Sequence, residues 1–150
     1  MKQIGAAVVG VGWCGGIRAE TLASHPLVKE LHLAEVREDR LEEMEAKTRP
    51  TTASTDYRRL LERKGIDAVY ISATPENLHF PMAKEFLQAG KHVFLEKPIV
   101  SLSSFCFASF INSSASSSVT AIGFSRNTCL PACRNSFAIG KCRFSGVAEM

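Results

Sequence analysis

Short apolar runs alternate with longer amphipathic or charged segments over the first hundred residues. The run Ile4–Val9 is apolar without interruption, which is typical of a strand covered on both faces in a parallel sheet. Similar short runs predict strands over residues 31–34, 51–54, 67–72 and 92–95. Between them, the pattern predicts helices over residues 17–23, 38–47, 57–64 and 79–88. Strands that alternate with helices in this way imply right-handed crossovers and a doubly wound parallel sheet, an α/β fold of the Rossmann type.

A glycine-rich loop follows the first strand directly. It reads Gly10-Val11-Gly12-Trp13-Cys14-Gly15 and leads into a predicted helix. In a dinucleotide-binding loop, Gly10 makes the tight turn off the strand, Gly12 leaves room for a pyrophosphate, and Gly15 lets the helix pack closely. The helix N-terminus then offers free N–H groups to the phosphates. We therefore predict that this loop, including Trp13 and Cys14, binds a dinucleotide, the alternative being a purely structural turn.

An acidic residue stands where a dinucleotide would place its adenosine ribose. Glu35 lies 20 residues beyond Gly15, at the end of the second predicted strand, and its carboxylate can accept hydrogen bonds from ribose hydroxyls. This favours NAD, because the carboxylate repels the 2′-phosphate of NADP. Arg37 and Arg40 follow closely, however, and either pair with that phosphate or lie on the solvated face of a charged helix. The sequence predicts NAD and leaves NADP possible.

The composition is that of a single globular domain. The chain has 150 residues, 45% of them hydrophobic and 22% charged, which leaves room for one domain of ordinary size and not for a second. No run reaches the ~18 apolar residues of a membrane span, and the N-terminus lacks the pattern of a signal peptide. We expect a soluble, cytoplasmic protein that does not associate with membranes.

Charge and residue usage change at about residue 100. The first hundred residues carry equal numbers of basic and acidic side chains, so the last fifty supply the whole net charge of +3. A charge this small and diffuse argues against nucleic-acid binding, which needs a clustered basic face. The later part is also rich in serine and holds four of the five cysteines. Their spacing lacks Cys-x-x-Cys pairs and no histidine is nearby, so we predict no metal site.

Two further motifs stand at the ends of predicted strands. The fourth strand is followed by Thr74-Pro75-Glu76-Asn77-Leu78-His79, and the fifth by Glu96-Lys97-Pro98. Ligands of open α/β sheets bind outside the carboxyl ends of the strands, where both motifs fall. Together with the glycine loop, these motifs resemble the glucose-fructose oxidoreductase, inositol dehydrogenase and MocA (Gfo/Idh/MocA) family over residues 3 to about 100.

The resemblance implies the dinucleotide-binding part of an NAD(P)-dependent oxidoreductase that transfers a hydride to or from a sugar- or cyclitol-like hydroxyl or carbonyl. In that family the lysine of the triplet lies beside the nicotinamide and the reacting hydroxyl, so Lys97 is the catalytic candidate here. Its ammonium would stabilise a developing alkoxide or help to move its proton. The resemblance also implies cofactor contacts for Thr74, Pro75, Asn77, His79, Glu96 and Pro98. For Asn77 and His79, a helix cap and a solvent-facing histidine remain alternatives.

The last part of the chain departs from the family pattern. Residues 119–127 fall where a family strand is expected, but residues 101–112 are poor in helix formers and carry no charge, so we expect low local order there. No histidine follows His92, and the catalytic Asp and His of the family's substrate domain have no counterpart. We therefore expect a Rossmann domain over residues 1–124 and an atypical tail over 125–150, from a truncated, frame-altered or degenerate coding sequence.

Two functions are compatible with these observations. The first is the cofactor domain of an oxidoreductase whose substrate domain is missing, which binds the cofactor without turning over the small-molecule substrate of the full-length family. The second is a non-catalytic dinucleotide-binding module that acts as a sensor or partner subunit. Although no turnover is expected from the isolated chain, any turnover that is detected would favour the first function over the second. The sequence leaves the substrate and the oligomeric state open.

Overall fold

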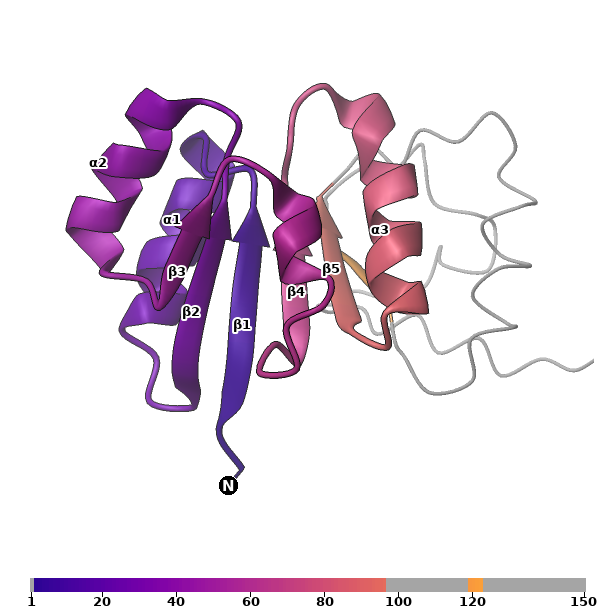
Figure 1. Cartoon of the computed structure of the whole chain (residues 1–150), viewed down its shortest axis with the longest axis horizontal. Coiled ribbons are helices and arrows are strands. Elements are labelled where there is room, and N and C mark those ends of the chain that lie inside the picture. The colour runs from indigo at the N-terminus through magenta and orange to yellow at the C-terminus, as the bar shows by residue number, and fades with distance from the viewer. Residues whose placement is uncertain (1, 97–118, 123–150) are drawn as a thin grey trace, which may run out of the picture.

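Parallel strands form one sheet in the order β3-β2-β1-β4-β5-β6, shown in Figure 1. The structure is a computed structural model, and it describes residues 2–96 and 119–122. The strands are β1 (Ile4–Val9), β2 (Val28–Ala34), β3 (Thr52–Ser54), β4 (Ala68–Ile71), β5 (His92–Glu96) and β6 (Val119–Ile122). The helices are α1 (Trp13–Ala23), α2 (Glu38–Thr48) and α3 (His79–Gln88), with 3₁₀ turns η1 (Tyr57–Leu60) and η2 (Glu76–Leu78). This strand order confirms the predicted doubly wound parallel sheet.

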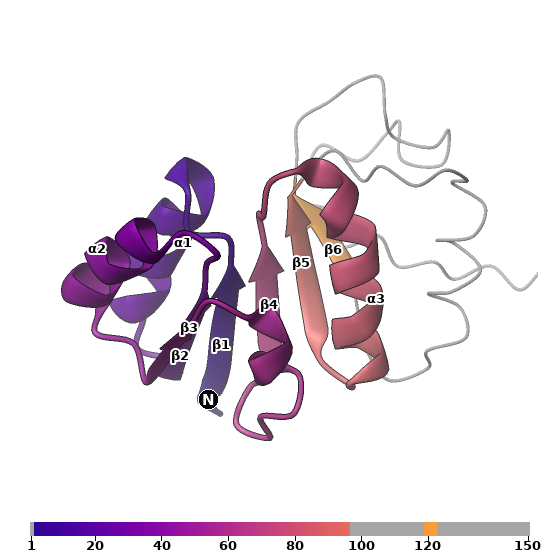
Figure 2. The same ribbon diagram turned by 45° about the horizontal axis from the view of Figure 1, so that its top comes forward.

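Helices cover both faces of the sheet, as Figures 1 and 2 show. The buried apolar side chains form two clusters on opposite faces: one holds Phe86 of α3, and the other holds Ala19 of α1 and Leu41 of α2. Successive residues of β4 alternate between them, because Ile71 joins the first cluster and Tyr70 the second. With both faces covered, the carboxyl ends of β1, β2, β4 and β5 meet at one edge, which is where the predicted site residues stand.

The predicted helix over residues 57–64 is wrong. Only the turn η1 forms there, and Asp56 caps it by accepting a hydrogen bond of 3.0 Å from the Arg58 N–H. Beyond Leu60 the chain returns to the sheet, and the carbonyl oxygen of Gly65 lies 1.8 Å from where a Cβ on Gly5 would be. A longer helix would carry the chain away from β1, whereas this close approach holds it against that strand.

Two other element boundaries differ from the prediction. α1 begins at Trp13 rather than at residue 17. Gly15 and Gly16 are poor helix formers, which hides this first turn in the sequence, but both are buried and the packing of the helix outweighs their low propensity. β2 begins at Val28 rather than at residue 31, although the charged Lys29 and Glu30 interrupt its apolar run.

The expected strand after residue 119 is present as β6, which pairs in parallel with β5. Residues 101–112 and 125–150, on which we made further predictions, lie outside the described residues.

In residues 2–96 and 119–122, no helix has the length and apolar character that crossing a membrane requires.

A histidine is buried in the middle of β2. His32 is 1% exposed, and its Nδ1 lies 2.8 Å from the Thr52 hydroxyl of β3. Its Nε2 lies 3.5 Å from a carboxylate oxygen of Glu30. Burial lowers the pKa of His32, and the positive charges of Arg63 and Lys91 lower it further, while Glu30 acts in the opposite direction. The imidazole is therefore neutral in the folded protein at pH 7.

Acidification is expected to destabilise the fold through His32. The unfolded imidazole takes up a proton near its usual pKa of 6.5, whereas the folded one resists protonation to a lower pH. Stability therefore falls as pH drops through this window, by at most about 1.4 kcal/mol per pH unit, and levels off below the folded pKa. Urea unfolding between pH 5 and pH 8 measures this slope. The slope should be smaller in His32→Gln than in wild type; equal slopes in the two proteins would contradict the assignment.

Candidate functional site

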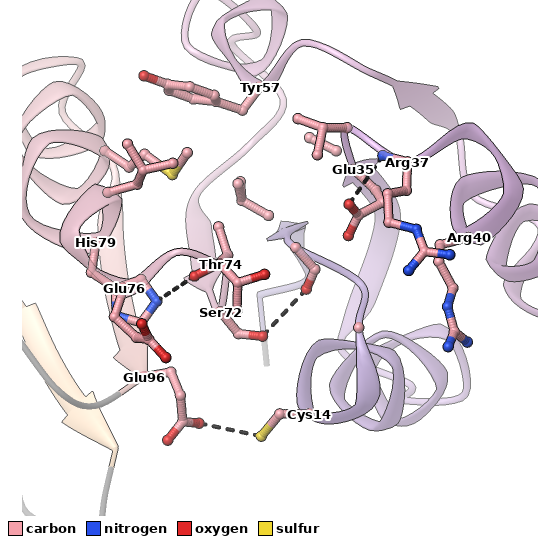
Figure 3. A pocket seen from close by; sticks show the side chains of 18 of the residues that line it. Cys14, Glu35, Arg37, Arg40, Tyr57, Ser72, Thr74, Glu76, His79 and Glu96 are labelled. Carbon is pink, nitrogen blue, oxygen red and sulfur yellow. Dashed lines mark hydrogen bonds between the residues drawn. The ribbon is translucent and has the colours of Figure 1, made fainter.

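A pocket of about 400 Å³ lies at the carboxyl ends of the central strands (Figure 3). Its walls come from the ends of β1, β2, β4 and β5, from the starts of α1, α2 and α3, and from the turns η1 and η2. Of the predicted site residues, those that line it are Gly10, Gly12, Trp13, Cys14, Glu35, Arg37, Thr74, His79 and Glu96. The fold thus brings together residues that are up to 86 positions apart in the sequence.

Gly10 and Gly15 have roles that the packing of the protein itself explains. Gly10 has a positive φ of 83°, and a Cβ there would lie 2.6 Å from backbone atoms of Ala73. A Cβ on Gly15 would lie 1.8 Å from the Gly10 carbonyl oxygen. The first glycine therefore makes the turn off β1, and the second lets α1 pass directly over that turn.

Gly12 differs from these two glycines, because, apart from its chain neighbours, no atom of the described residues lies within 4 Å of where its Cβ would be. It precedes α1 as the N-cap, no side chain caps the helix, and no acidic residue stands in its first turn. The first turn of α1 therefore presents its backbone N–H groups and its partial positive charge to the pocket. Trp13, the first residue of α1, is 87% exposed beside this opening. The open surface above an uncapped helix fits a pyrophosphate.

Glu35 is tied to the glycine loop. One carboxylate oxygen accepts a hydrogen bond of 2.8 Å from the Val11 N–H, and the other accepts one of 3.2 Å from the Arg37 N–H. Reasoning from the sequence does not predict the first of these bonds, which joins the end of β2 to the turn after β1. Two carboxylate oxygens offer about four acceptor positions, so Glu35 retains capacity for a ribose hydroxyl.

Each of the two arginines that follow Glu35 forms an ion pair with a carboxylate of α2. Arg37 donates to the Asp39 carboxylate, which raises the pKa of Arg37 and lowers the pKa of Asp39. Arg40 lies 3.2 Å from a carboxylate oxygen of Glu43. All four side chains are well exposed, so the pairs are weak. Both arginines line the pocket, yet a 2′-phosphate would have to compete with these carboxylates for them.

The segment after β4 contributes to the pocket unevenly. The Ser72 hydroxyl donates to the Gly10 carbonyl at 3.3 Å, and Thr74 lines the pocket ahead of a cis peptide bond to Pro75. Pro75 and Asn77 are exposed and do not line it.

His79 is 2% exposed, so the alternative of a solvent-facing histidine is wrong. Its Nε2 lies 2.8 Å from the Ala73 carbonyl oxygen. Because a carbonyl can only accept, this nitrogen carries the hydrogen. The imidazole thus fastens the start of α3 to the end of β4.

The far end of the pocket is formed by Glu96, the last residue of β5. Its carboxylate accepts hydrogen bonds from the Tyr70 hydroxyl and from the Cys14 thiol. Lys97 and Pro98 follow it directly and lie outside the described residues, so their roles stay predictions. In the described part of the chain, no three His, Cys, Asp or Glu side chains are grouped so that they could hold a metal ion.

Several pocket residues were missed by reasoning from the sequence. They include Tyr57, Glu76 and Met82; Tyr70, which does not line the pocket but donates a hydrogen bond to the lining residue Glu96, was missed as well. Glu76 stands inside a motif that we had singled out, so its neighbours could have indicated it. Tyr57 and Met82 lie in two separate predicted helices, over residues 57–64 and 79–88, where nothing in the local pattern distinguishes them from core residues.

Comparison with known proteins agrees with this geometry. Residues 4–120 match an oxidoreductase family with an NAD-binding Rossmann fold, Gfo/Idh/MocA. The chain is 37% identical over 92 residues to a myo-inositol 2-dehydrogenase of Thermotoga maritima, a match that covers 61% of this chain and 27% of that enzyme. It is 31% identical over 98 residues to the uncharacterized oxidoreductase YrbE of Bacillus subtilis, covering 65% and 28% of the two chains. The chain thus spans about a quarter of the length of these relatives.

A solved structure shows the same fold. The scyllo-inositol dehydrogenase from Lactobacillus casei, with bound NAD(H) and scyllo-inositol, superposes with a TM-score of 0.71 at 27% identity. The superposition covers 80% of this chain and 36% of that one. The family match spans more than half of the residues and includes the glycine loop, Glu35 and the ends of β4 and β5. The chain therefore belongs to the Gfo/Idh/MocA family of oxidoreductases and contains the NAD-binding Rossmann fold of that family.

Proposed function

We propose that residues 1–124 bind NAD(H) as the cofactor domain of an oxidoreductase acting on a sugar- or cyclitol-like hydroxyl or carbonyl. The observation that carries this proposal is the open surface at Gly12 above the uncapped N-terminus of α1. In this arrangement the α1 N–H groups hold the pyrophosphate, and Glu35 accepts a hydrogen bond from the adenosine ribose. The similarity to a myo-inositol 2-dehydrogenase and to a scyllo-inositol dehydrogenase supports the substrate class.

The bound nicotinamide would supply or accept the hydride, and the residues of this chain would hold it in place. By family resemblance, the ammonium of Lys97 would lie beside the reacting hydroxyl, where it would stabilise negative charge on the oxygen or move its proton. His79 fixes the end of β4 from within the core, and Glu96 fixes the end of β5. These contacts give the nicotinamide end of the pocket a rigid floor.

We further propose that these 150 residues, on their own, bind the cofactor without turning over substrate. The chain spans about a quarter of the length of its relatives, whose remaining part would bind the substrate and place a general acid or base. A cytoplasmic location and the atypical nature of residues 125–150 also stay predictions. A second candidate is a non-catalytic dinucleotide-binding module, which is favoured by a pocket whose lining, within the described residues, is supplied by residues 9–96.

The single tryptophan offers a direct test of cofactor binding. Trp13 is the only tryptophan of the chain and lines the pocket, so a bound dihydronicotinamide should quench its fluorescence by energy transfer. Saturable quenching by NADH is expected, with weaker quenching by NADPH. The proposal would be contradicted if circular dichroism shows that the chain is folded and neither NADH nor NADPH quenches its fluorescence saturably. Oxidation of an inositol by the isolated chain would contradict its inactivity and exclude the non-catalytic module.

Neutralising Glu35 is expected to weaken NAD binding and to narrow the preference over NADP. Glu35→Gln loses the carboxylate that accepts from a ribose hydroxyl and that repels a 2′-phosphate, so NADH affinity should fall about tenfold and the difference from NADPH should shrink. Titration of Trp13 fluorescence with both cofactors measures the two constants. Glu38→Gln, an exposed change in the first turn of α2, is the matched control and should alter neither. An equal loss for NADH and NADPH in Glu35→Gln would show that the charge does not select the cofactor.

A further inference from the structure

Three polar side chains from three different elements meet at the β5 end of the pocket. The Tyr70 hydroxyl of β4 donates a hydrogen bond of 2.6 Å to the Glu96 carboxylate of β5. The Cys14 thiol of α1 donates to the same oxygen, Oε2, at 3.3 Å. The thiol and the hydroxyl are themselves 3.9 Å apart. Figure 3 shows Glu96 and Cys14 facing each other across the edge of the pocket.

Tyr70 is suited to act as a permanent donor. The side chain is 5% exposed and packs in the cluster beneath α1, with the Arg18 guanidinium 5.8 Å from the centre of its ring. Burial and the neighbouring Glu96 carboxylate both raise the pKa of Tyr70. The phenol therefore keeps its proton at physiological pH and can only direct it towards the carboxylate.

The sheet order separates the two carboxylates of the pocket. Glu35 follows β2 and Glu96 ends β5, and these strands are three positions apart in the sheet. At ~4.8 Å per strand, this is about 14 Å, a span that suits an extended dinucleotide rather than a single nucleoside. If the adenosine ribose is at Glu35 and the pyrophosphate at the start of α1, the second nucleoside lies at Glu96.

Glu96 also needs to be held in place. Its carboxylate shares the pocket with the N-terminus of α1, and a mobile carboxylate could turn towards phosphates bound there and repel them. Two donors on one oxygen, one from the sheet and one from the helix, fix its direction. The first donor is buried and the second stands inside the glycine loop, so the arrangement couples β4, β5 and α1.

We propose that Tyr70 and Cys14 are positioning residues that hold the Glu96 carboxylate against the nicotinamide nucleoside of the bound cofactor. There the carboxylate accepts a hydrogen bond from a ribose hydroxyl or from the carboxamide N–H. This inference rests on the proposed binding of NAD(H), in which the family resemblance already implies a cofactor contact for Glu96. It adds the roles of Tyr70 and Cys14, whose hydrogen bonds to Glu96 are particular to this chain's side chains.

Comparing NADH with ADP tests the assignment, because ADP retains the adenosine and both phosphates but lacks the nicotinamide nucleoside. Calorimetric titration of the full 150-residue chain gives both dissociation constants. In Tyr70→Phe, NADH should bind about three- to tenfold more weakly while ADP binding is unchanged, as expected for a charge-assisted hydrogen bond that loses its alignment. Combining Tyr70→Phe with Glu96→Gln should weaken NADH binding no further than Glu96→Gln alone.

Cys14 provides a matched pair of variants at a site that is not deeply buried. Cys14→Ala removes the donor and should weaken NADH relative to ADP, whereas Cys14→Ser keeps a donor and should preserve the ratio. Equal losses for NADH and ADP in Tyr70→Phe and Cys14→Ala would show a merely structural role and overturn the inference. Equal affinities of the wild-type chain for ADP and NADH would also overturn the inference. Wild-type chain that binds neither would instead refute the proposed function, and this inference with it.

Discussion

Gly15→Ala is expected to destabilise the domain by about 3 kcal/mol or more and to abolish NADH binding. The added Cβ would lie 1.8 Å from the Gly10 carbonyl oxygen and 2.9 Å from the carbonyl carbon. Both atoms are backbone, so no side chain can move aside, and α1 must shift away from β1. The shift would displace the N–H groups that face the pocket. Urea unfolding and Trp13 titration of the same sample measure the two effects.

Two neighbouring glycines provide matched controls for Gly15→Ala. A Cβ on Gly16 would meet the Met44 sulfur and the Val11 carbonyl oxygen, both at an ordinary contact distance of 3.5 Å, so Gly16→Ala should be neutral or stabilising by up to about 1 kcal/mol through helix propensity. In the part of the chain that the structure describes, a Cβ on Gly12 would meet nothing within 4 Å beyond its chain neighbours, so Gly12→Ala should keep most of the wild-type stability yet bind NADH at least tenfold more weakly. Unchanged NADH binding in Gly12→Ala would show that the surface at Gly12 is not where the cofactor lies.

Phe86→Ala is expected to cost about 3–5 kcal/mol of unfolding free energy, a large share of the stability of a domain this size. Phe86 is fully buried in α3, at the centre of the cluster between that helix and the sheet. Its ring lies 6.0 Å from that of Tyr57, which lines the pocket, so the cavity would also loosen η1. Chemical unfolding at constant pH measures the loss.

The control for Phe86→Ala is the same change on a more exposed strand position. Phe94 of β5 is 37% exposed, so Phe94→Ala removes less buried surface and should cost clearly less. Comparable losses for both variants would mean that the face of the sheet under α3 is not the main core. NADH affinity, measured on the fraction that stays folded, should change little in Phe94→Ala.

The fold could be predicted where local pattern and long-range packing agree. Ile4–Val9 was found at its true bounds because a strand buried on both faces is apolar at every position. For α1 the sequence pattern predicts a start that is too late, because Gly15 and Gly16 lower the helix propensity of its first turn and only packing on the sheet favours the helix there. The segment after Asp56 failed for a similar reason: its residues suit a helix, but the return to β1 at Gly5 limits it to a turn.

The residues of the site also fall into those that the sequence predicts and those that it does not. The glycine loop and Glu35 could be predicted, because their chemistry depends on spacing along the chain. Tyr70 could not, because β4 is otherwise an apolar strand and the partner of its hydroxyl lies 26 positions later. The pairing of Arg37 with Asp39 was equally hidden, since the sequence shows the charges but not which of them meet. Contacts between distant strand ends become visible only when the sheet order is known.

The bond between Glu35 and the Val11 N–H has a consequence for how affinity is distributed over the cofactor. It means that the adenosine end and the phosphate end of the pocket are already assembled before any ligand arrives. The entropy cost of ordering the loop is then part of folding rather than of binding, so fragments of the cofactor bind to a preorganised site. Adenosine and pyrophosphate should therefore each bind separately with measurable affinity. Their linkage in one molecule should raise that affinity further, because the second group then binds without a further loss of translational entropy.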